Sequence, residues 1–125
     1  MKPKILWLQG VTCNGNSHSF FNLPNFKTLY DQFEWLYHPI LPSKLSLDEL
    51  FGAKPEILVL EGGLKKGWTK GQNELVSLFL ELALRAKRVV AVGSCAVYGG
   101  VFREYEKNIS GALFQGGKRV DGMRL

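Results

Sequence analysis

The stretch PEILVLEGG, residues 55–63, decides the fold class of this chain. Four consecutive apolar residues, Ile57 to Leu60, lie there between a proline and a pair of glycines. A short apolar run without polar alternation, bounded by turn residues, is typical of a strand that is buried on both faces of a sheet. The sequence therefore predicts a strand over 56–60 in a parallel sheet with helices on both sides.

Similar runs occur before and after this stretch. KILWL, residues 4–8, and RVVAV, residues 88–92, have the same apolar character, and FEWLY, residues 33–37, ends at His38-Pro39. Each run is bounded by glycine, proline or polar residues, as strands usually are. We therefore expect four strands, over 4–8, 33–37, 56–60 and 88–92.

Helical signals separate these strands. Ser17 is suited to cap a short helix, but Pro24 interrupts it, so a second piece is expected over 25–30. Ser46 followed by Glu49 is a capping-box pattern and predicts one or two turns over 47–51. Over 72–87, apolar residues recur at the spacing of one helix face: Leu75, Leu78, Phe79, Leu82 and Ala86. After Gly100 the pattern weakens.

Strands joined by helices in this way predict a doubly wound α/β domain with a mainly parallel sheet of four or more strands. In such a sheet the carboxyl ends of neighbouring strands meet at one edge, where ligands bind. The loops expected there are GVTCNGN after the first strand, EGGLKKG after the third and GSCAVYGG after the fourth. Both cysteines, Cys13 and Cys95, and the carboxylate of Glu61 lie in these loops.

Composition excludes several classes of protein. The longest apolar runs are far shorter than the roughly 20 residues that cross a bilayer, and the N-terminal run is too short for a secretory signal. The net charge of +5 is spread along the chain, with its densest group at Lys65, Lys66 and Lys70, which is typical of a solvated surface. We expect no membrane span, no nucleic-acid partner and a cytoplasmic location, where the two cysteines are free or directed at a metal.

The loops alone leave several chemistries open. Gly10 to Gly15 is glycine-rich like a phosphate loop, but it lacks the Gly-Lys-Ser/Thr ending and the dinucleotide spacing. Cys95 lies in a turn that resembles a nucleophile elbow, yet no sequence feature pairs it with a histidine. Glu61 follows a buried strand, so it is either exposed, at an interface, or involved in proton handling.

Five motifs in order resemble the small, iron–sulfur subunit of nickel–iron (NiFe) hydrogenases, in its N-terminal flavodoxin-like domain. That family has Trp-Leu-Gln-Gly followed by a Cys-Thr-Gly-Cys type loop, then Tyr-His-Pro, Glu-Gly and Gly-Thr-Cys-Ala with a later Gly-Gly. The matching segments here are WLQG at 7–10, CNGN at 13–16, YHP at 37–39, EGG at 61–63 and GSCAVYGG at 93–100. The resemblance covers Ile5 to about Val101 and implies a single flavodoxin-like domain over 1–125.

The resemblance implies specific roles for the residues of these loops. Cys13 and Cys95 correspond to the first and third thiolates of a 4Fe-4S cluster that exchanges electrons with a large partner subunit. Glu61 corresponds to the acidic residue near that subunit interface. The remaining loop positions that match are Gly10, Gly15, Asn16, Gly62 and Ser94. The related cluster subunit of respiratory complex I shares the Gly-Ser-Cys-Ala type of loop.

Two departures from the family pattern bear on the cofactor. Asn16 stands in place of the second cysteine, and a neutral amide is a poor substitute for thiolate on iron. The family's fourth cysteine, in a Gly-Cys-Pro-Pro segment, has no counterpart in these 125 residues, and we expect the family's C-terminal cluster domain to be absent. Two thiolates are fewer than the four that a cluster normally requires.

Three hypotheses follow. In the first, the protein is a relative that has lost the cluster and acts in assembly or interaction with a hydrogenase large subunit or a related redox complex, which can be bound to a membrane. In the second, it transfers electrons through a 4Fe-4S cluster completed by a second protomer, by a partner, or by His18. In the third, it binds a flavin or a nucleotide at the same loops. Enzymatic activity of its own is left open.

Overall fold

Four parallel strands form the central sheet of the computed structural model, in the order β2-β1-β3-β7. The structure describes residues 2–12, 15–98, 109–111, 114–115 and 118–119. The strands of this sheet are β1 (Lys4–Gln9), β2 (Glu34–Tyr37), β3 (Ile57–Glu61) and β7 (Arg88–Val92). All four strands predicted from the sequence are therefore confirmed, with ends that differ by at most one residue.

The strand order shows that the sheet is doubly wound. From β1 the chain passes to β2 on one side, and it then crosses over to β3 and β7 on the other side. This is the order of flavodoxin-like folds, in which the direction of winding reverses between the first and third strands. The predicted flavodoxin-like α/β fold is confirmed.

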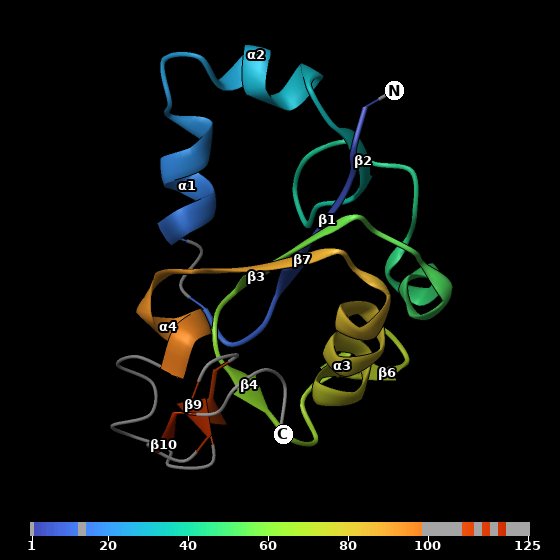
Figure 1. Ribbon diagram of the computed structural model, residues 1–125, viewed down its shortest axis with the longest axis vertical. Coiled ribbons are helices and arrows are strands. Elements are labelled where there is room, and N and C mark those ends of the chain that lie inside the picture. The colour runs from blue at the N-terminus through green and yellow to red at the C-terminus, as the bar shows by residue number, and fades with distance from the viewer. Residues whose placement is uncertain (1, 13–14, 99–108, 112–113, 116–117, 120–125) are drawn as a thin grey trace.

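The helices cover both faces of the sheet (Figure 1). Helices α1 (Gly15–Phe21) and α2 (Phe26–Asp31) lie on one side, and α3 (Leu75–Arg85) lies on the other with the 3-10 helix η1 (Leu47–Gly52). The last helix, α4 (Gly93–Tyr98), follows β7 directly. The chain is thus layered as helix, sheet and helix.

Alternate residues of the strands face two separate apolar clusters. Leu6 and Leu8 of β1 pack with Leu58 and Leu60 of β3 in the cluster that α3 and η1 complete. The intervening residues form the second cluster, beneath Phe20 and Tyr30 of the first two helices: Ile5, Trp7, Trp35 and Val59. Burial of both faces explains why the central strands β1 and β3 are apolar along most of their length.

The helix starts differ in part from the sequence expectation. Pro24 does separate α1 from α2, and the capping box of Ser46 and Glu49 is present at the start of η1. Ser17, however, lies inside α1 and does not cap it. Helix α3 begins at Leu75, three residues after the predicted start, because the carboxylate of Glu74 accepts hydrogen bonds from the first turn.

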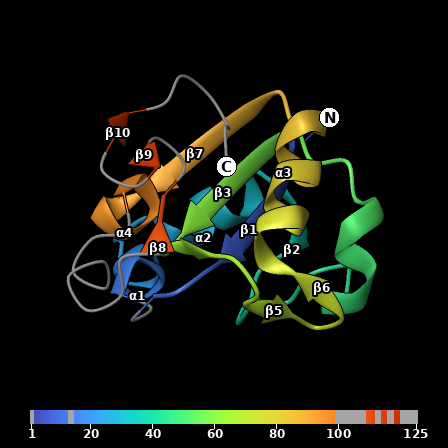
Figure 2. The same ribbon diagram turned by 90° about the horizontal axis from the view of Figure 1, so that it is seen from below.

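Three pairs of two-residue strands were not predicted. They are β4 (Leu64–Lys65) with β8 (Ile109–Ser110), β5 (Thr69–Lys70) with β6 (Asn73–Glu74), and β9 (Phe114–Gln115) with β10 (Lys118–Arg119). Figure 2 shows β5 and β6 at the N-terminal end of α3. Such short strands carry no periodic pattern, so sequence reasoning finds only their glycine turns. Within the described part of the chain, no helix has the length and apolarity needed to span a membrane.

Candidate functional site at the carboxyl edge of the sheet

The carboxyl ends of three strands are level with one another. Gln9 at the end of β1 pairs with Glu61 at the end of β3, and Glu61 pairs in turn with Val92 at the end of β7. The loops that follow these residues therefore start side by side, as the parallel arrangement predicted. This edge brings together the segments that carry the candidate residues.

Glu61 lies at the centre of this edge and is completely buried. Its Oε1 accepts hydrogen bonds from Trp7 Nε1 at 3.0 Å, Gln9 Nε2 at 2.9 Å and Ser17 Oγ at 2.6 Å. Its Oε2 accepts one from the backbone N–H of Ser17 at 3.0 Å. Four donors satisfy a charge that would otherwise be costly to bury. The carboxylate joins β1, β3 and the first turn of α1.

The protonation state of Glu61 follows from these contacts. Burial raises the pKa of the carboxyl, but the hydrogen bonds from Ser17, Gln9 and Trp7 outweigh burial and leave the pKa below its usual value. Donors of this kind stabilise the charged form. Glu61 is therefore an ionised anchor in the folded protein. The role expected for it, at an interface or in proton handling, stays a prediction.

Sequence reasoning did not identify the partners of Glu61. The register of the parallel sheet places Gln9 beside Glu61, so the contact between these two side chains could have been predicted from the sequence. Ser17 was assigned to a helix cap, whereas its hydroxyl and its backbone N–H both donate to the carboxylate. That assignment is corrected: a capping serine would accept a hydrogen bond from a free backbone N–H of the helix, whereas Ser17 donates to a buried, charged acceptor.

Asn16 bridges two of the loops. Its side-chain Nδ2 donates a hydrogen bond to the carbonyl of Val92 at 3.1 Å, although the two residues are 76 positions apart. The next residue, Gly93, has φ of +82°, and a Cβ there would lie 2.5 Å from Asn16 Nδ2. The residue in place of the second cysteine thus links the start of α1 to the corner between β7 and α4.

The glycines of the first and third loops allow their backbones to come into contact. Gly10 N donates to the Glu61 carbonyl at 2.8 Å, and Val11 and Gly63 exchange two hydrogen bonds of 2.9 Å. A Cβ at Gly10 would lie 2.1 Å from the Gly63 oxygen, and one at Gly62, where φ is +101°, would lie 2.8 Å from Thr12 Cβ. Only glycine fits these positions. The crevice between β1 and β3 is therefore crossed by backbone hydrogen bonds.

The thiolates are only partly described. Cys13 lies outside the described residues, and Ser94 and Cys95 belong to α4, of which only their backbone is described. Gly15 starts α1, and His18 is exposed on the same helix, where its ring contacts that of Phe21 at 6.3 Å. Among the described residues, no group of three or more His, Cys, Asp or Glu side chains is placed to hold a metal ion.

The donors among these 125 residues do not by themselves make up the ligand set of a 4Fe-4S cluster. Such a cluster normally takes four thiolates, and the sequence contains two cysteines. At the position of the second thiolate, the amide of Asn16 already donates to a backbone carbonyl. The ligands expected of Cys13, Cys95 and His18 stay predictions.

His38, at the end of β2, is a buried histidine that the sequence did not single out as part of this edge. It is 2% exposed, and its Nδ1 accepts hydrogen bonds from the backbone N–H groups of Ile40 and Leu41 at 3.0 and 3.2 Å. Among the described residues, its Nε2 has no hydrogen-bond partner. Burial lowers the pKa of His38 to about 4, against the opposing effect of the Glu61 charge. The imidazole is therefore neutral at physiological pH and stabilises the turn after β2.

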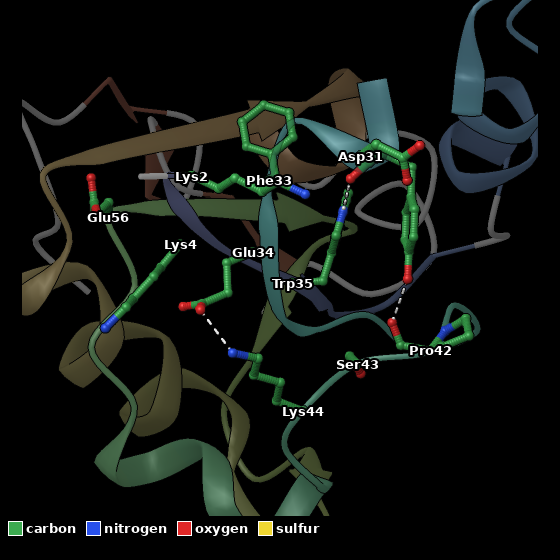
Figure 3. A pocket seen from close by; sticks show the side chains of 11 residues that line it. Lys2, Lys4, Asp31, Phe33, Glu34, Trp35, Pro42, Ser43, Lys44 and Glu56 are labelled. Carbon is green, nitrogen blue, oxygen red and sulfur yellow. Dashed lines mark hydrogen bonds and ion pairs between the residues drawn. The ribbon is translucent and has the colours of Figure 1, made fainter. Parts of the chain in front are cut away.

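A cavity of about 590 Å³ lies at the opposite edge of the sheet (Figure 3). It is lined by residues at the amino ends of β1, β2 and β3, and the Lys44 ammonium lies 2.7 Å from the Glu34 carboxylate within it. Tyr30 Oη donates to the Pro42 carbonyl at 2.8 Å on its rim. The cavity is separate from the loops of the carboxyl edge.

Comparison with known proteins identifies the family. The model of a family described as "NADH ubiquinone oxidoreductase, 20 Kd subunit" matches residues 13–123. The chain belongs to this family. The match begins in the loop after β1 and includes β3, β7 and α4.

The relatives of this protein include hydrogenase subunits. It is 26% identical over 129 aligned positions to the small subunits of F420 non-reducing hydrogenases I and II of Methanosarcina mazei. The alignment covers 80% of the chain and 33% of each relative, so the chain spans about a third of their length. The sequence resemblance to hydrogenase small subunits is confirmed.

Solved structures agree with this assignment. This protein superposes on a chain of the Ni-Fe-Se hydrogenase of Desulfomicrobium baculatum with a TM-score of 0.68 and 25% identity. The superposition covers 89% of this chain and 50% of that one. A chain of the [NiFeSe] hydrogenase of Desulfovibrio vulgaris Hildenborough gives a TM-score of 0.67 at 23% identity, with 89% and 47% covered. The protein is a hydrogenase small-subunit-like member of its family with a shared fold.

Proposed function

We propose that this protein acts in the assembly of, or in interaction with, a hydrogenase or another redox complex, and that it does so without a 4Fe-4S cluster of its own. The observation that carries the proposal is the hydrogen bond from Asn16 to the Val92 carbonyl. In a cluster-binding relative, bonds from thiolates to iron would hold the same loops together. Here a side-chain amide holds them together.

The local structure supports the replacement of a thiolate by the amide of Asn16. Asn16 packs against Gly93, whose positive φ and missing Cβ leave room for the amide. Glu61 fixes the start of α1 independently, through Ser17. Hydrogen bonds to a charged group contribute about 1.5–3 kcal/mol each, so the edge has internal support that does not depend on a metal.

The partner that we propose is a hydrogenase large subunit or a related redox protein. The family model and both curated relatives bear the names of subunits, and this chain has the fold of such a subunit. We propose a cytoplasmic location, including the cytoplasmic face of a membrane-bound complex. A flavin or nucleotide has less support as a ligand, because the loop backbones are bonded to each other where it would lie.

The first experiment measures the cluster. We expect anaerobically expressed protein to be colourless, with iron and sulfide far below one atom per chain, and to melt at the same temperature after Cys13→Ala or Cys95→Ala. A brown protein with about four irons per dimer, lost in either variant, would instead support a cluster shared between two protomers. That result would overturn the proposal.

A second experiment tests whether Asn16 replaces a ligand. Asn16→Cys introduces the thiolate of the family pattern but leaves three cysteines in the chain. We expect iron uptake to stay low and the protein to lose about 1 kcal/mol of stability, because the bond to Val92 is lost. Full cluster uptake by the wild-type protein under the same reconstitution conditions would contradict the proposal.

The third experiment tests the interaction. The protein is co-expressed with the large subunit of a nickel–iron hydrogenase, and the complex is isolated through a tag on the large subunit. We expect the two to co-purify in equal amounts, and the Cys13→Ala and Cys95→Ala variants to co-purify equally well. Dependence of the complex on either thiol would favour a role for a shared cluster.

A further inference from the structure

Leu84, in the last turn of α3, has the most exposed large apolar side chain in the described part of the chain. It is 81% exposed, whereas Leu75, Leu78 and Leu82 of the same helix are completely buried. Phe51, near the end of η1, is 42% exposed. Single exposed apolar residues are common, so these two become informative only through what lies beside them.

Four hydrogen bonds connect the segments that carry these two residues, 51–56 and 84–88. The side chain of Arg85 donates two of them, to backbone carbonyls at the end of η1. Two backbone N–H groups at the start of β7 donate the others to the Glu56 carbonyl, at 2.9 and 3.0 Å. The segments therefore lie side by side, where the green helix η1 is next to α3 in Figure 1. A surface that is ordered in advance loses less conformational entropy when it binds.

Three cations lie on the same two segments. Lys54 belongs to the first segment, Lys87 and Arg88 belong to the second, and all three are exposed. Within the residues that the structure describes, none of the three takes part in an ion pair. We call Phe51, Lys54, Leu84, Lys87 and Arg88 together the amino-edge surface, because β3 and β7 begin there.

The charge of the two segments is strongly positive. They contain four basic residues and one acidic residue, Glu56, so their net charge is +3. Glu81, one turn before Arg85 on α3, pairs with Arg85 Nη2 at 3.0 Å. The two carboxylates of η1 lie in its first turn, where each accepts a hydrogen bond from a backbone N–H group. The amino-edge surface thus combines two apolar side chains with unpaired positive charge.

The amino-edge surface is separate from the loops of the carboxyl edge. Strand β4 follows the carboxyl end of β3 and pairs with β8, and helix α4 follows the carboxyl end of β7. The amino-edge surface lies at the other ends of β3 and β7. A protein bound there therefore contacts a different part of the sheet from the candidate site.

We propose that the amino-edge surface binds an acidic segment of a second partner protein, with apolar side chains of that segment packed on Leu84 and Phe51. Complementary charge selects a segment rich in aspartate or glutamate and speeds its association. The inference goes beyond the proposed function, because that proposal concerns the loops of the carboxyl edge. A chain with both surfaces connects two proteins.

Other occupants fit the amino-edge surface less well. A second copy of this chain brings the same positive charge against itself, and like charges in contact weaken association. Anionic membranes are typically bound by clusters of four to eight basic residues, and this surface has three unpaired cations. An acidic protein segment needs only a small apolar contact and a few complementary charges.

The test uses a fluorescein-labelled helical peptide that has two leucines one turn apart, flanked by glutamates. Fluorescence anisotropy gives its Kd for the folded protein. We expect Leu84→Ala to weaken binding about tenfold, because the leucine side chain is no longer buried by the peptide. Its melting temperature should equal that of the wild type, since the side chain is exposed and alanine favours helices. Lys87→Glu should also weaken binding about tenfold.

The controls make the same changes elsewhere. Leu23 is 41% exposed between α1 and α2, and Lys66 is exposed after β4. Leu23→Ala and Lys66→Glu should each change the Kd by less than about twofold at physiological salt. A peptide with lysines in place of the glutamates should bind at least about tenfold more weakly than the acidic peptide.

Several results would overturn the proposal. They are unchanged affinity in Leu84→Ala, equal weakening by Lys87→Glu and Lys66→Glu, and no binding of the acidic peptide by folded wild-type protein. Tighter binding to phosphatidylglycerol vesicles would assign the surface to a membrane. A dimer in sedimentation that Leu84→Ala dissociates would assign it to a second copy. Circular dichroism melting verifies that each variant is folded.

The outcome is separable from that of the proposed function. If the protein co-purifies with the large subunit but does not bind the acidic peptide, the amino-edge inference fails and the proposed interaction stands. If iron analysis reveals a cluster while Leu84→Ala and Lys87→Glu still lose peptide binding, the proposed function fails and the amino-edge inference stands.

Discussion

Glu61 illustrates at the scale of one residue how the edge of the sheet is held together. A buried carboxylate is expected to be costly, yet this one has four donors, two from β1 and two from α1. Such a group is stabilising only while all its partners are in place. Its removal should therefore affect the whole edge and not only β3.

Glu61→Gln tests this dependence. A glutamine keeps the shape of the side chain, but its amide nitrogen must then face a donor where a carboxylate oxygen accepts now. We expect a loss of about 2 kcal/mol in the free energy of unfolding, measured with urea. Glu56→Gln, directly before the other end of the same strand, should lose less than about 0.5 kcal/mol. Equal effects of the two substitutions would contradict the anchoring role.

His38 makes stability depend on pH. Burial lowers its pKa from 6.5 to about 4, so the unfolded chain takes up a proton before the folded protein does. Stability from this group is complete above about pH 6.5 and decreases as the pH falls towards 4. At about 1.4 kcal/mol for each unit of pKa, the loss approaches 3 kcal/mol.

Urea unfolding across this pH range measures the effect. His38→Asn retains an acceptor near the position of Nδ1 but does not titrate, so we expect the decrease between about pH 6.5 and 5, above the range where the carboxyls take up protons, to disappear in this variant. His18→Asn, a change at an exposed histidine, should retain the decrease. A wild-type curve that is flat over the same range would contradict the assignment of a buried, neutral imidazole.

At the scale of elements, the contact between α1 and the corner of β7 and α4 depends on one pair. Asn16 donates to the Val92 carbonyl, and Gly93 leaves the space that the amide occupies. A double-mutant cycle separates these contributions, because each substitution changes one side of the contact.

Gly93→Ala should destabilise the protein by about 2 kcal/mol, since its φ of +82° is unfavourable for alanine and its Cβ meets Asn16. Asn16→Ala should cost about 1 kcal/mol. The double variant should lose less than the sum of the two, because the clash needs both side chains. Gly52→Ala is the control, since a Cβ there meets nothing within 4 Å. Strict additivity would contradict the contact.

At the scale of the whole molecule, the sheet and its winding could be predicted because apolar runs such as residues 57–60 have few alternatives. The convergence of the three loops followed from the parallel topology alone. The bond between Asn16 and Val92 could not be predicted, since it depends on how two segments 76 positions apart are aligned. The predicted role of Ser17 and the predicted start of α3 were wrong for a similar reason. The carboxylate of Glu61 accepts from Ser17, and the carboxylate of Glu74 caps α3, and neither contact is evident from the sequence pattern.

In the described part of the chain, β7 is an edge strand of the sheet, and its exposed apolar side chains predict self-association. Its Val89 and Val90 are 39% and 43% exposed at the edge of the sheet. Apolar edge strands promote self-association. Val90→Thr keeps a β-branched side chain, so we expect stability to change by less than about 1 kcal/mol and light scattering at high concentration to decrease.

Val59→Thr is the matched control, because Val59 is 5% exposed in the core. Burial of a hydroxyl there should destabilise the protein by about 1–3 kcal/mol. Unchanged scattering in Val90→Thr would show that β7 does not contribute to self-association.

The contact between Glu61 and the backbone N–H of Ser17 has a consequence for hydrogen exchange. Amides in the first turn of a helix as short as α1 normally exchange with solvent deuterium through local fraying. The Ser17 amide, however, is bonded at 3.0 Å to a carboxylate that Trp7 and Gln9 also hold, so fraying of α1 alone does not release it. Its exchange rate should match those of the central strands, and this one amide would then report on opening of the whole sheet.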